Sequence, residues 1–391
     1  MAPFDFLWLL LPLAAASGWL VGRYGKRRRE SAAAADDLRS NYFKGINYLL
    51  NEQPDKAIEA FIKVLEVDSE TVETHLALGN LYRRRGEVDR AIRIHQNLIA
   101  RPNLESEQRS EALLELGHDY LSAGLLDRAE NLLQELADGG DYRVQALRQL
   151  IDIYEQEKDW NKAIACAHLL EKVTGNHLSP VVAHYQCELA ERFRESAEVD
   201  AALDMVKKAL ATDDRCVRAS ILEGDILTDR DEHERAIRAY QRVEEQDADY
   251  VPETIERMQF SHRALDRPQE MDEYLNGLME RYGWITPMLA MAESKHTREG
   301  TPEAIAFISE QLRRRTSVRG LDRLLELELE QSDAEKGAHV SILKDLTGEL
   351  LSDRPIYKCL HCGFPARRLH WQCPSCKHWN TIKPIQGVEG E

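Results

Sequence analysis

The sequence lacks the short motifs that usually carry catalysis. It contains no GxSxG turn, no Walker phosphate loop, no HExxH helix and no glycine-rich dinucleotide loop. Its histidines, such as His75, His95 and His168, fall singly at positions of helical spacing. Carboxylates are abundant, but at helical spacing they mark solvated faces. We therefore expect a protein that is not an enzyme.

Basic residues are outnumbered by acidic ones, and cysteine is scarce. The chain has 51 basic against 68 acidic residues and a net charge of −17. Because phosphate binding needs a basic stripe, we expect no nucleic-acid partner. Of seven cysteines, only Cys166, Cys187 and Cys216 precede residue 359, and each stands alone on a predicted helix as a small core residue. This argues against a disulfide framework and indicates a reducing compartment.

One spacing recurs from about residue 40 to residue 315. A small or apolar residue is followed by tyrosine after three positions, by alanine after twelve and by a further side chain after sixteen. The copies are Gly45/Tyr48/Ala57/Phe61, Gly79/Tyr82/Ala91/His95, Gly117/Tyr120/Ala129/Leu133 and the weaker Ile151/Tyr154/Ala163/Ala167. The alanine position continues at Ala201, Ala236 and Ala304. This is the period of tetratricopeptide repeats, in which small residues let paired helices cross closely.

The pattern predicts an all-α superhelical solenoid over residues 38–351, with about nine helix pairs that become degenerate after residue 250. In each pair the first helix carries the glycine and tyrosine, and the second carries the alanine. Asp89 and Asp127 stand near the start of second helices, as Thr301 does later, and we expect them to cap exposed amides. The late helices are expected at Pro252–Ala264, Pro268–Arg281, from Thr301, at Gly320–Gln331 and at Asp333–Leu351.

The first helices of such an array line the inner surface of the superhelix, which binds peptides or protein segments. In this register, five polar residues face that groove. They are Asn80, Arg83, Arg84, His118 and Asp225. We take them as candidate partner-binding residues. The alternative is that each is a solvated surface position.

Residues 1–22 form a predicted transmembrane anchor. Phe4–Gly22 is apolar except for Asp5, and nineteen helical residues span about 28 Å, enough for a bilayer core. Basic residues begin at Arg23, which predicts a periplasmic N-terminus, a juxtamembrane linker at 23–37 and a cytoplasmic remainder. A cleaved signal peptide is the alternative, but its positive charge would precede the apolar run.

Within this anchor Ala14, Gly18 and Gly22 fall four residues apart on one helix face. Small residues at that spacing let a second transmembrane helix approach closely, so they predict a packing face. The alternative is that alanine and glycine are simply common in membrane spans.

Two CxxC pairs stand near the C-terminus, within a predicted module at 355–384. Ten residues separate Cys359 and Cys362 from Cys373 and Cys376. Such pairs place four thiolates around one tetrahedral ion, iron or zinc. The pattern resembles the two knuckles of rubredoxin, but it has a shorter gap, and Lys377 stands where rubredoxin has glycine. A structural clip is the favoured role, and electron transfer is the alternative.

Other residues of this module suggest how it packs. With four thiolates available, the neighbouring His361, His370 and His378 need not be ligands. We expect its aromatic residues to fill its small core or to dock it against the array. We expect its basic residues to meet an acidic partner or the acidic array. The aromatic residues are Phe364, Trp371 and Trp379, and the basic ones are Arg367, Arg368, Lys377 and Lys383.

An anchor, a repeat array and a terminal CxxC pair, in this order, resemble the lipopolysaccharide assembly protein B (LapB, YciM) family of Gram-negative bacteria. The resemblance covers essentially the full length and implies that Cys359, Cys362, Cys373 and Cys376 are the metal ligands. It further implies a non-catalytic inner-membrane adaptor that promotes proteolysis of the LpxC deacetylase by the protease FtsH. The membrane protein PbgA (YejM) would restrain it through the anchor, and coordination of other lipopolysaccharide assembly proteins would be a further role.

Two other functions stay open at the level of sequence. One is a general scaffold that holds lipopolysaccharide enzymes together without delivering a substrate to a protease. The other is a redox or metal-sensing protein in which the rubredoxin-like site carries electrons or reports iron.

Overall fold

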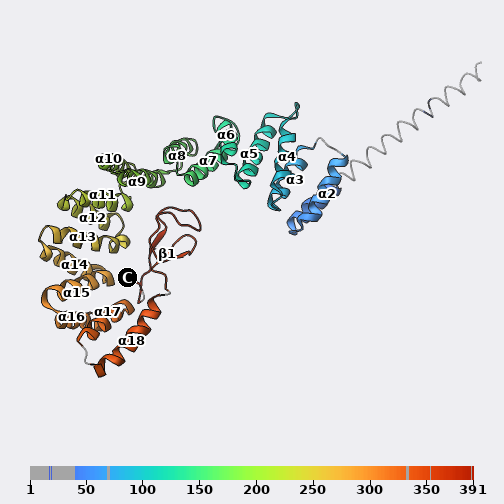
Figure 1. The fold of residues 1–391 in the computed structure, drawn as a ribbon. Helices are drawn as coiled ribbons and strands as arrows, with labels where there is room; N and C mark the ends of the chain where they lie inside the picture. The colour runs from blue at the N-terminus through green and yellow to red at the C-terminus, as the bar shows by residue number, and fades with distance from the viewer. Residues whose placement is uncertain are drawn as a thin grey trace, which may run out of the picture. The chain divides into compact units, whose positions relative to one another are not determined.

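The computed structural model describes residues 17, 19, 40–67, 71–331, 334–352, 354–388 and 390–391. These form successive helices followed by one small sheet (Figure 1). The predicted anchor lies outside the described residues except for positions 17 and 19, and so do Ala14, Gly18 and Gly22. Among the described residues no helix has the length and apolar character needed to cross a membrane.

Residues 40–50 are helical and precede the long series of helices. That series is α2 (Pro54–Val67), α3 (Val72–Arg84), α4 (Val88–Ile99), α5 (Ser106–Ser122), α6 (Leu126–Ala137), α7 (Arg143–Glu157), α8 (Trp160–Thr174), α9 (Ser179–Glu195), α10 (Val199–Thr212), α11 (Val217–Asp229), α12 (His233–Gln246), the 3₁₀ helix η1 (Ala248–Tyr250), α13 (Pro252–Ala264), α14 (Pro268–Tyr282), α15 (Ile285–Glu299), α16 (Thr301–Arg314), α17 (Val318–Gln331) and α18 (Ala334–Ser352). Leaving η1 aside, the described helices make nine pairs in chain order, and the chain is a tetratricopeptide solenoid.

The chain divides into two compact units. One comprises residues 1–159 with 172–174, and the other comprises 160–171 with 175–391. The first unit holds the early repeats. The second holds the later repeats together with the C-terminal sheet.

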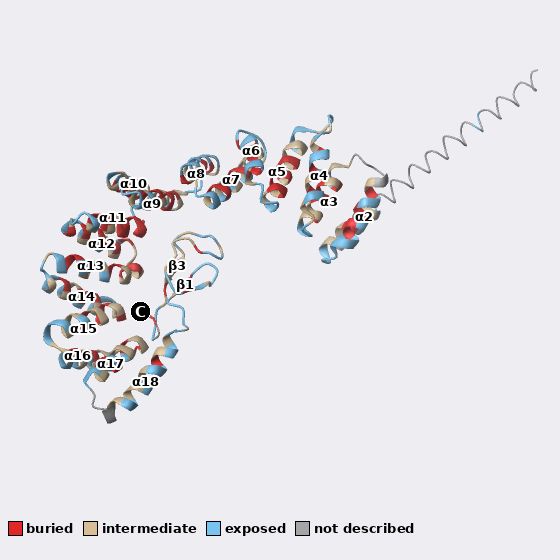
Figure 2. Ribbon diagram, in the orientation of Figure 1, coloured by how far each residue is buried: buried red, intermediate tan, exposed pale blue. Residues whose placement is uncertain are grey.

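The repeated glycine lets the two helices of a pair approach closely. A Cβ on Gly224 would lie 2.2 Å from the ring of Tyr240, and a Cβ on Gly79 would lie 2.3 Å from the ring of His95. Each of these rings stands sixteen residues after its glycine, as the repeat predicts. The repeated alanine is fully buried in seven pairs, and buried positions recur on helices throughout the described array (Figure 2). These alanines are Ala57, Ala91, Ala129, Ala163, Ala202, Ala236 and Ala304.

The prediction that Ala201 occupies this position is wrong by one residue. Helix α10 begins at Val199, and the buried alanine is the fourth helical residue, Ala202, as Ala236 is in α12. In α14 the fourth residue is Met271, only 3% exposed. The repeat geometry therefore continues beyond residue 250, and the sequence pattern fades because methionine replaces alanine there.

The predicted capping hydrogen bonds are absent. Asp89 and Asp127 lie inside the first turns of α4 and α6, and the cap positions Glu87 and Leu125 make no side-chain cap bond. Thr301 is likewise the first residue of α16, after Gly300. The carboxylates of the first turn can still interact favourably with the helix dipole.

After α18 the chain forms three short strands, β1 (Tyr357–Cys359), β2 (Pro365–Ala366) and β3 (Ile382–Pro384). They make an antiparallel sheet in the order β2-β1-β3. In its register Cys359 lies opposite Ile382. This sheet supports the two cysteine knuckles.

Candidate metal centre and partner surfaces

The four C-terminal cysteines converge on one point. The Sγ atoms of Cys359 and Cys376 lie 3.8 Å apart, those of Cys362 and Cys373 lie 3.7 Å apart, and all four lie within 4.8 Å of one another. A tetrahedral ion with metal–sulfur bonds of about 2.3 Å requires sulfurs about 3.8 Å apart. The four cysteines therefore form a site for one tetrahedral metal ion, as the sequence predicts.

Two matching turns create this geometry. After the first pair, Gly363 has φ +79° and its N–H donates to Cys359 O at 2.9 Å. After the second pair, Lys377 has φ +61° and its N–H donates to Cys373 O at 2.9 Å. Lysine thus adopts the left-handed conformation that glycine would favour, at a cost of about 1 kcal/mol. The departure from the rubredoxin pattern leaves the knuckle intact.

The four thiols differ in exposure and in electrostatic setting. Cys359 and Cys373 are buried, whereas Cys362 is exposed and Cys376 is half-buried. Burial raises the pKa of Cys359, but its hydrogen bonds with the Thr381 hydroxyl and with backbone amides outweigh this effect and lower the pKa to about 6. Cys359 is thus disposed to bind metal as a thiolate at neutral pH. The site is closed on one side and open to solvent on the other.

The metal module packs against array helices of the second unit through its aromatic rings. Docking against the array was one of the two roles predicted for these residues. Trp379 stacks on His184 of α9 with ring centroids 5.1 Å apart, and its edge contacts include Tyr185 at 5.8 Å. Trp371 lies 5.5 Å from the ring of Tyr250. Phe364 instead packs within the module beside the buried cysteines. Both predicted roles of the aromatic residues are therefore confirmed, in different residues.

Polar contacts fix the same interface near η1. The Nζ atom of Lys383 lies 2.8 Å from carboxylate oxygens of both Asp247 and Asp249. The hydroxyl of Tyr250 lies 3.0 Å from the carbonyl oxygen of Ile382 and can donate to it. This basic residue of the module thus meets the acidic array, which was one of the two predicted alternatives.

The chain's last described residue adds a contact that sequence analysis does not predict. Glu391 is buried, and its carboxylate lies 2.7 Å from Arg319 of α17 and accepts from the backbone N–H of Thr286 at 3.0 Å. The segment after β3 is therefore tied back to the late repeats.

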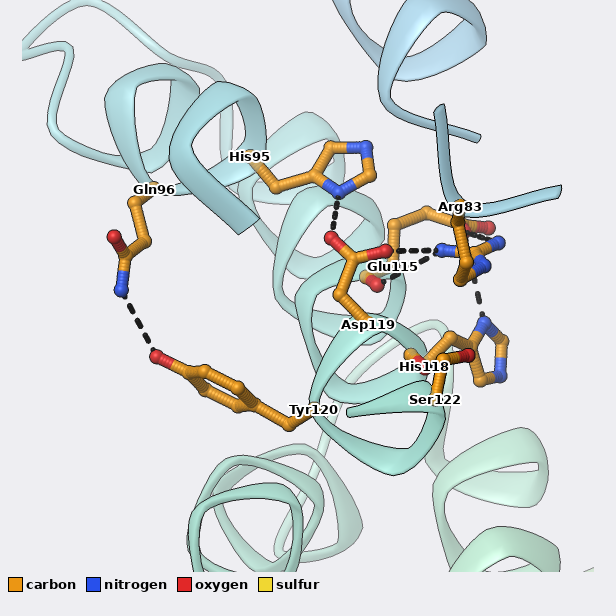
Figure 3. A network of polar contacts seen from close by, with 8 residues as sticks. All are labelled: Arg83, His95, Gln96, Glu115, His118, Asp119, Tyr120 and Ser122. Atoms are coloured by element: carbon orange, nitrogen blue, oxygen red, sulfur yellow. Dashed lines mark hydrogen bonds and ion pairs between the residues drawn. The ribbon is translucent and has the colours of Figure 1, made fainter. Parts of the chain in front are cut away.

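Among the candidate partner-binding residues, Arg83 and His118 belong to a polar network between neighbouring repeats (Figure 3). Arg83 of α3 pairs with Glu115 at 2.7 Å and with Asp119 at 2.8 Å, both on α5. His118 lies 3.6 Å from Glu115. Asp119 also binds Nδ1 of the buried His95, at 2.5 Å. These side chains hold adjacent helices together in addition to any partner role.

The electrostatics of this network centre on Glu115. Burial raises its pKa, but hydrogen bonds from His118 and Arg83, together with the charge of Arg83, lower it to about 2. Glu115 is therefore ionised at every physiological pH. Its charge balances that of Arg83.

The other candidates are dispersed. Arg84 is exposed, while Asn80 is half-buried and its Oδ1 accepts no hydrogen bond from the described residues. Asp225 belongs to the second unit, where Arg257 lies at 2.9 Å and Tyr240 donates to it at 2.8 Å. It lines a cavity of about 570 Å³ between the array and the module. Other residues lining that cavity include Arg194, Arg218, Leu369 and Trp371.

Two cysteines that the sequence placed singly come together. Cys187 of α9 and Cys216, which caps α11, are both buried and within hydrogen-bonding reach. Both are free and buried, so the prediction of small core cysteines is confirmed. Their proximity was not predicted, because Cys187 lies within α9 and Cys216 immediately before α11, and 29 residues do not match the repeat period.

The chain matches known protein families along much of its length. A family model described as the rubredoxin metal binding domain matches residues 357–384, and tetratricopeptide repeat models match 38–71, 74–108 and 187–251. Among solved structures, a Naa15/Naa10 complex bound to HypK-THB is similar with a TM-score of 0.42 and 14% identity, covering 82% of this chain and 51% of that one.

Similarity to curated proteins extends over the whole sequence. Lipopolysaccharide assembly protein B of Escherichia coli strain K12 is 40% identical over 99% of both chains. The Haemophilus influenzae protein of the same name is 32% identical over 98% of this chain and 99% of its own. With the repeat array and the four-cysteine site in place, this identity shows that the chain belongs to the lipopolysaccharide assembly protein B family.

Proposed function

We propose that this protein is a non-catalytic adaptor of lipopolysaccharide synthesis at the bacterial inner membrane. It promotes proteolysis of the LpxC deacetylase by the membrane protease FtsH, and it coordinates other lipopolysaccharide assembly proteins. The observation that carries the proposal is the full-length likeness to relatives named lipopolysaccharide assembly protein B. The repeat architecture supports it, because tetratricopeptide arrays act by binding other proteins.

Tethering supplies the physical mechanism. An adaptor that holds a client and a protease on one membrane-attached array raises their effective concentration without chemistry of its own. In this proposal Phe4–Gly22 is a single-pass anchor, the N-terminus is periplasmic and the array is cytoplasmic. FtsH and PbgA, both membrane proteins, would then meet the anchor at the packing face of Ala14, Gly18 and Gly22.

The metal centre serves as a structural clip in this proposal. Trp379, Lys383 and Tyr357 all contact array residues, so the ion that shapes the module also holds it on the repeats. A module of this size has a small core, so its metal supplies most of its stability. Loss of the ion would therefore alter a surface of the adaptor.

The direct test is the lifetime of the LpxC deacetylase after translation is stopped, in cells with and without this protein. We expect a longer half-life on depletion and a normal one when the wild-type chain is restored. The double variant Cys359→Ser/Cys362→Ser should fail to restore it. The matched control is Cys166→Ala, a buried cysteine of α8 outside the metal site. If depletion of this protein does not change the half-life of LpxC, the alternative of a scaffold that delivers no substrate would be favoured.

The anchor is tested separately. Gly18→Leu places a branched side chain on the packing face, and we expect less FtsH and PbgA to co-purify from membranes. The control Leu11→Val keeps the span apolar without changing a small residue. If Gly18→Leu recovers as much FtsH and PbgA as the wild type does, the small-residue face is not the contact surface for these partners.

A further inference from the structure

Two histidines of the metal module lie beside one of its four cysteines. Ligand atoms of His361, His378 and Cys376 all lie within 4.8 Å of one another. The two imidazole rings are stacked, with centroids 3.8 Å apart and planes 20° from parallel. These residues come from the two knuckles, so the fold of the module brings them together. Among the described residues, this is the one group besides the four cysteines that could hold an ion.

A backbone contact sets the tautomer of His378. Its Nδ1 lies 2.9 Å from the carbonyl oxygen of Cys376. A carbonyl can only accept, so Nδ1 carries the hydrogen and the lone pair of the neutral ring is on Nε2. Metal-binding histidines in proteins are commonly oriented in this way, with one ring nitrogen donating to a carbonyl and the other free to bind.

The cluster lies on the open side of the four-cysteine site. Cys359 and Cys373 are buried at 1% and 0% exposure, whereas both histidines are exposed and Cys376 is half-buried. An ion from solvent therefore meets the exposed Cys362, the half-buried Cys376 and the imidazoles before it meets the buried pair of thiols. Of these, Cys376 belongs to both groups.

We propose that His361, His378 and Cys376 form a labile loading site that passes a divalent metal ion into the four-cysteine centre. The ligands suit a borderline ion such as Zn²⁺ or Fe²⁺. One nitrogen of each imidazole and the Cys376 sulfur would hold the ion first, and the Cys376 thiol would release its proton to water. Cys359, Cys362 and Cys373 would then replace the two imidazoles. Each of those thiols also releases one proton to water, and no electron is transferred.

The histidine cluster should bind an ion only transiently. It offers three ligands, whereas the four-cysteine centre offers four, and one of the three, Cys376, belongs to both sites. In addition, the cationic Lys377 is next to His378 in the chain. Four thiolates bind the same ion more tightly. At equilibrium the chain therefore holds one ion, and the histidines affect how fast it enters and leaves.

The test follows metal exchange in the full-length, zinc-loaded chain mixed rapidly with excess Co²⁺, so that the module is folded throughout. Formation of the four-thiolate site is read from its sulfur-to-cobalt absorption. We expect His361→Gln/His378→Gln to slow uptake by about tenfold or more. Removal of Co²⁺ by a chelator should slow by the same factor, because a loading site lowers the barrier in both directions. His370→Gln, a histidine outside the cluster, should match the wild type.

Two single variants at position 361 add a further comparison. His361→Asp keeps a metal ligand beside His378 and should take up Co²⁺ as rapidly as the wild type, whereas His361→Gln removes that ligand and should take it up more slowly. The proposal is overturned if the double glutamine variant loads at the wild-type rate, or if it loses affinity with no change in uptake rate. It is also overturned if the wild type retains a second Co²⁺ that the variant lacks, since the cluster would then be a resident site.

Discussion

Trp379 of the metal module stacks on His184 of α9, with ring centroids 5.1 Å apart and planes 23° from parallel. His184 is 3% exposed, and burial together with the nearby Arg218 lowers its pKa to about 3. The same indole lies near the guanidinium of Arg218, at 5.9 Å. This contact therefore joins the metal-shaped knuckle to a neutral histidine in the core of the second unit.

We predict that Trp379→Ala releases the module from the array. The substitution removes the stacking on His184 and the edge contacts with Trp160 and Tyr185. Truncating a large packed aromatic residue costs about 3 kcal/mol. Hydrogen exchange should rise in α9 and in β3 together. Trp379→Phe, which keeps an aromatic ring, should lose less. Unchanged exchange in α9 would show that the polar contacts near η1 suffice to hold the module.

Acid should weaken the second unit through His184. The unfolded histidine binds a proton below pH 6.5, but the folded one does so only near pH 3. The unfolded state thus gains protons first, and stability falls as the pH drops below 6.5. At pH 5 the loss amounts to about 2 kcal/mol.

The measurement is the urea midpoint of the metal-loaded chain at pH 7 and at pH 5. His184→Gln cannot titrate, so its midpoint should change less between these values than that of the wild type. Equal changes in both proteins would assign the acid sensitivity to other groups, such as the metal thiolates.

Removing the metal should separate the module from the array without unfolding the repeats. The knuckles depend on the ion, whereas the helices have their own buried core of alanine, leucine and tyrosine. A chelator should therefore expose Trp371 and Trp379 to a fluorescence quencher while helical circular dichroism stays nearly constant. Loss of most of the helical signal on chelation would mean that the repeats also need the ion.

The sequence predicts the elements well because the repeat signal is local. Pro252–Ala264 is found with the predicted bounds, and Pro268–Arg281 extends by one residue, to Tyr282. The one-residue error at Ala201 arose because periodicity alone does not fix the length of the loop between α8 and α9. The metal ligands were equally accessible, because two CxxC turns define a site by themselves.

What the sequence could not supply were contacts between distant segments. Nothing in the spacing of Trp379 and His184 indicates that their rings stack. Likewise, the sequence does not show which of its many acidic residues would pair with Lys383, and the structure places Asp247 and Asp249 there. Arg83 and His118 were predicted to face a groove. The ion pair of Arg83 with Glu115 depends on how α3 and α5 pack, which no motif encodes, whereas His118 contacts Glu115 from three residues further along the same helix.

The helix crossings offer a final prediction, in which one substitution has opposite effects at two glycines of the second unit. In Gly224→Ala the new Cβ would lie 2.2 Å from the Tyr240 ring, so the helices must move apart, at a cost of about 1–3 kcal/mol. In Gly348→Ala, within α18, the Cβ meets nothing within 4 Å. There the higher helix propensity of alanine should stabilise by up to about 1 kcal/mol.

Urea unfolding of the two variants at pH 7 measures both signs. Because Gly224 and Gly348 are both interior helical positions, propensity favours alanine at each, and a difference in sign isolates the crossing contact. If Gly224→Ala were as stable as Gly348→Ala, the repeated glycine would not be needed for close approach. Its recurrence at Gly45, Gly79 and Gly117 would then require another cause.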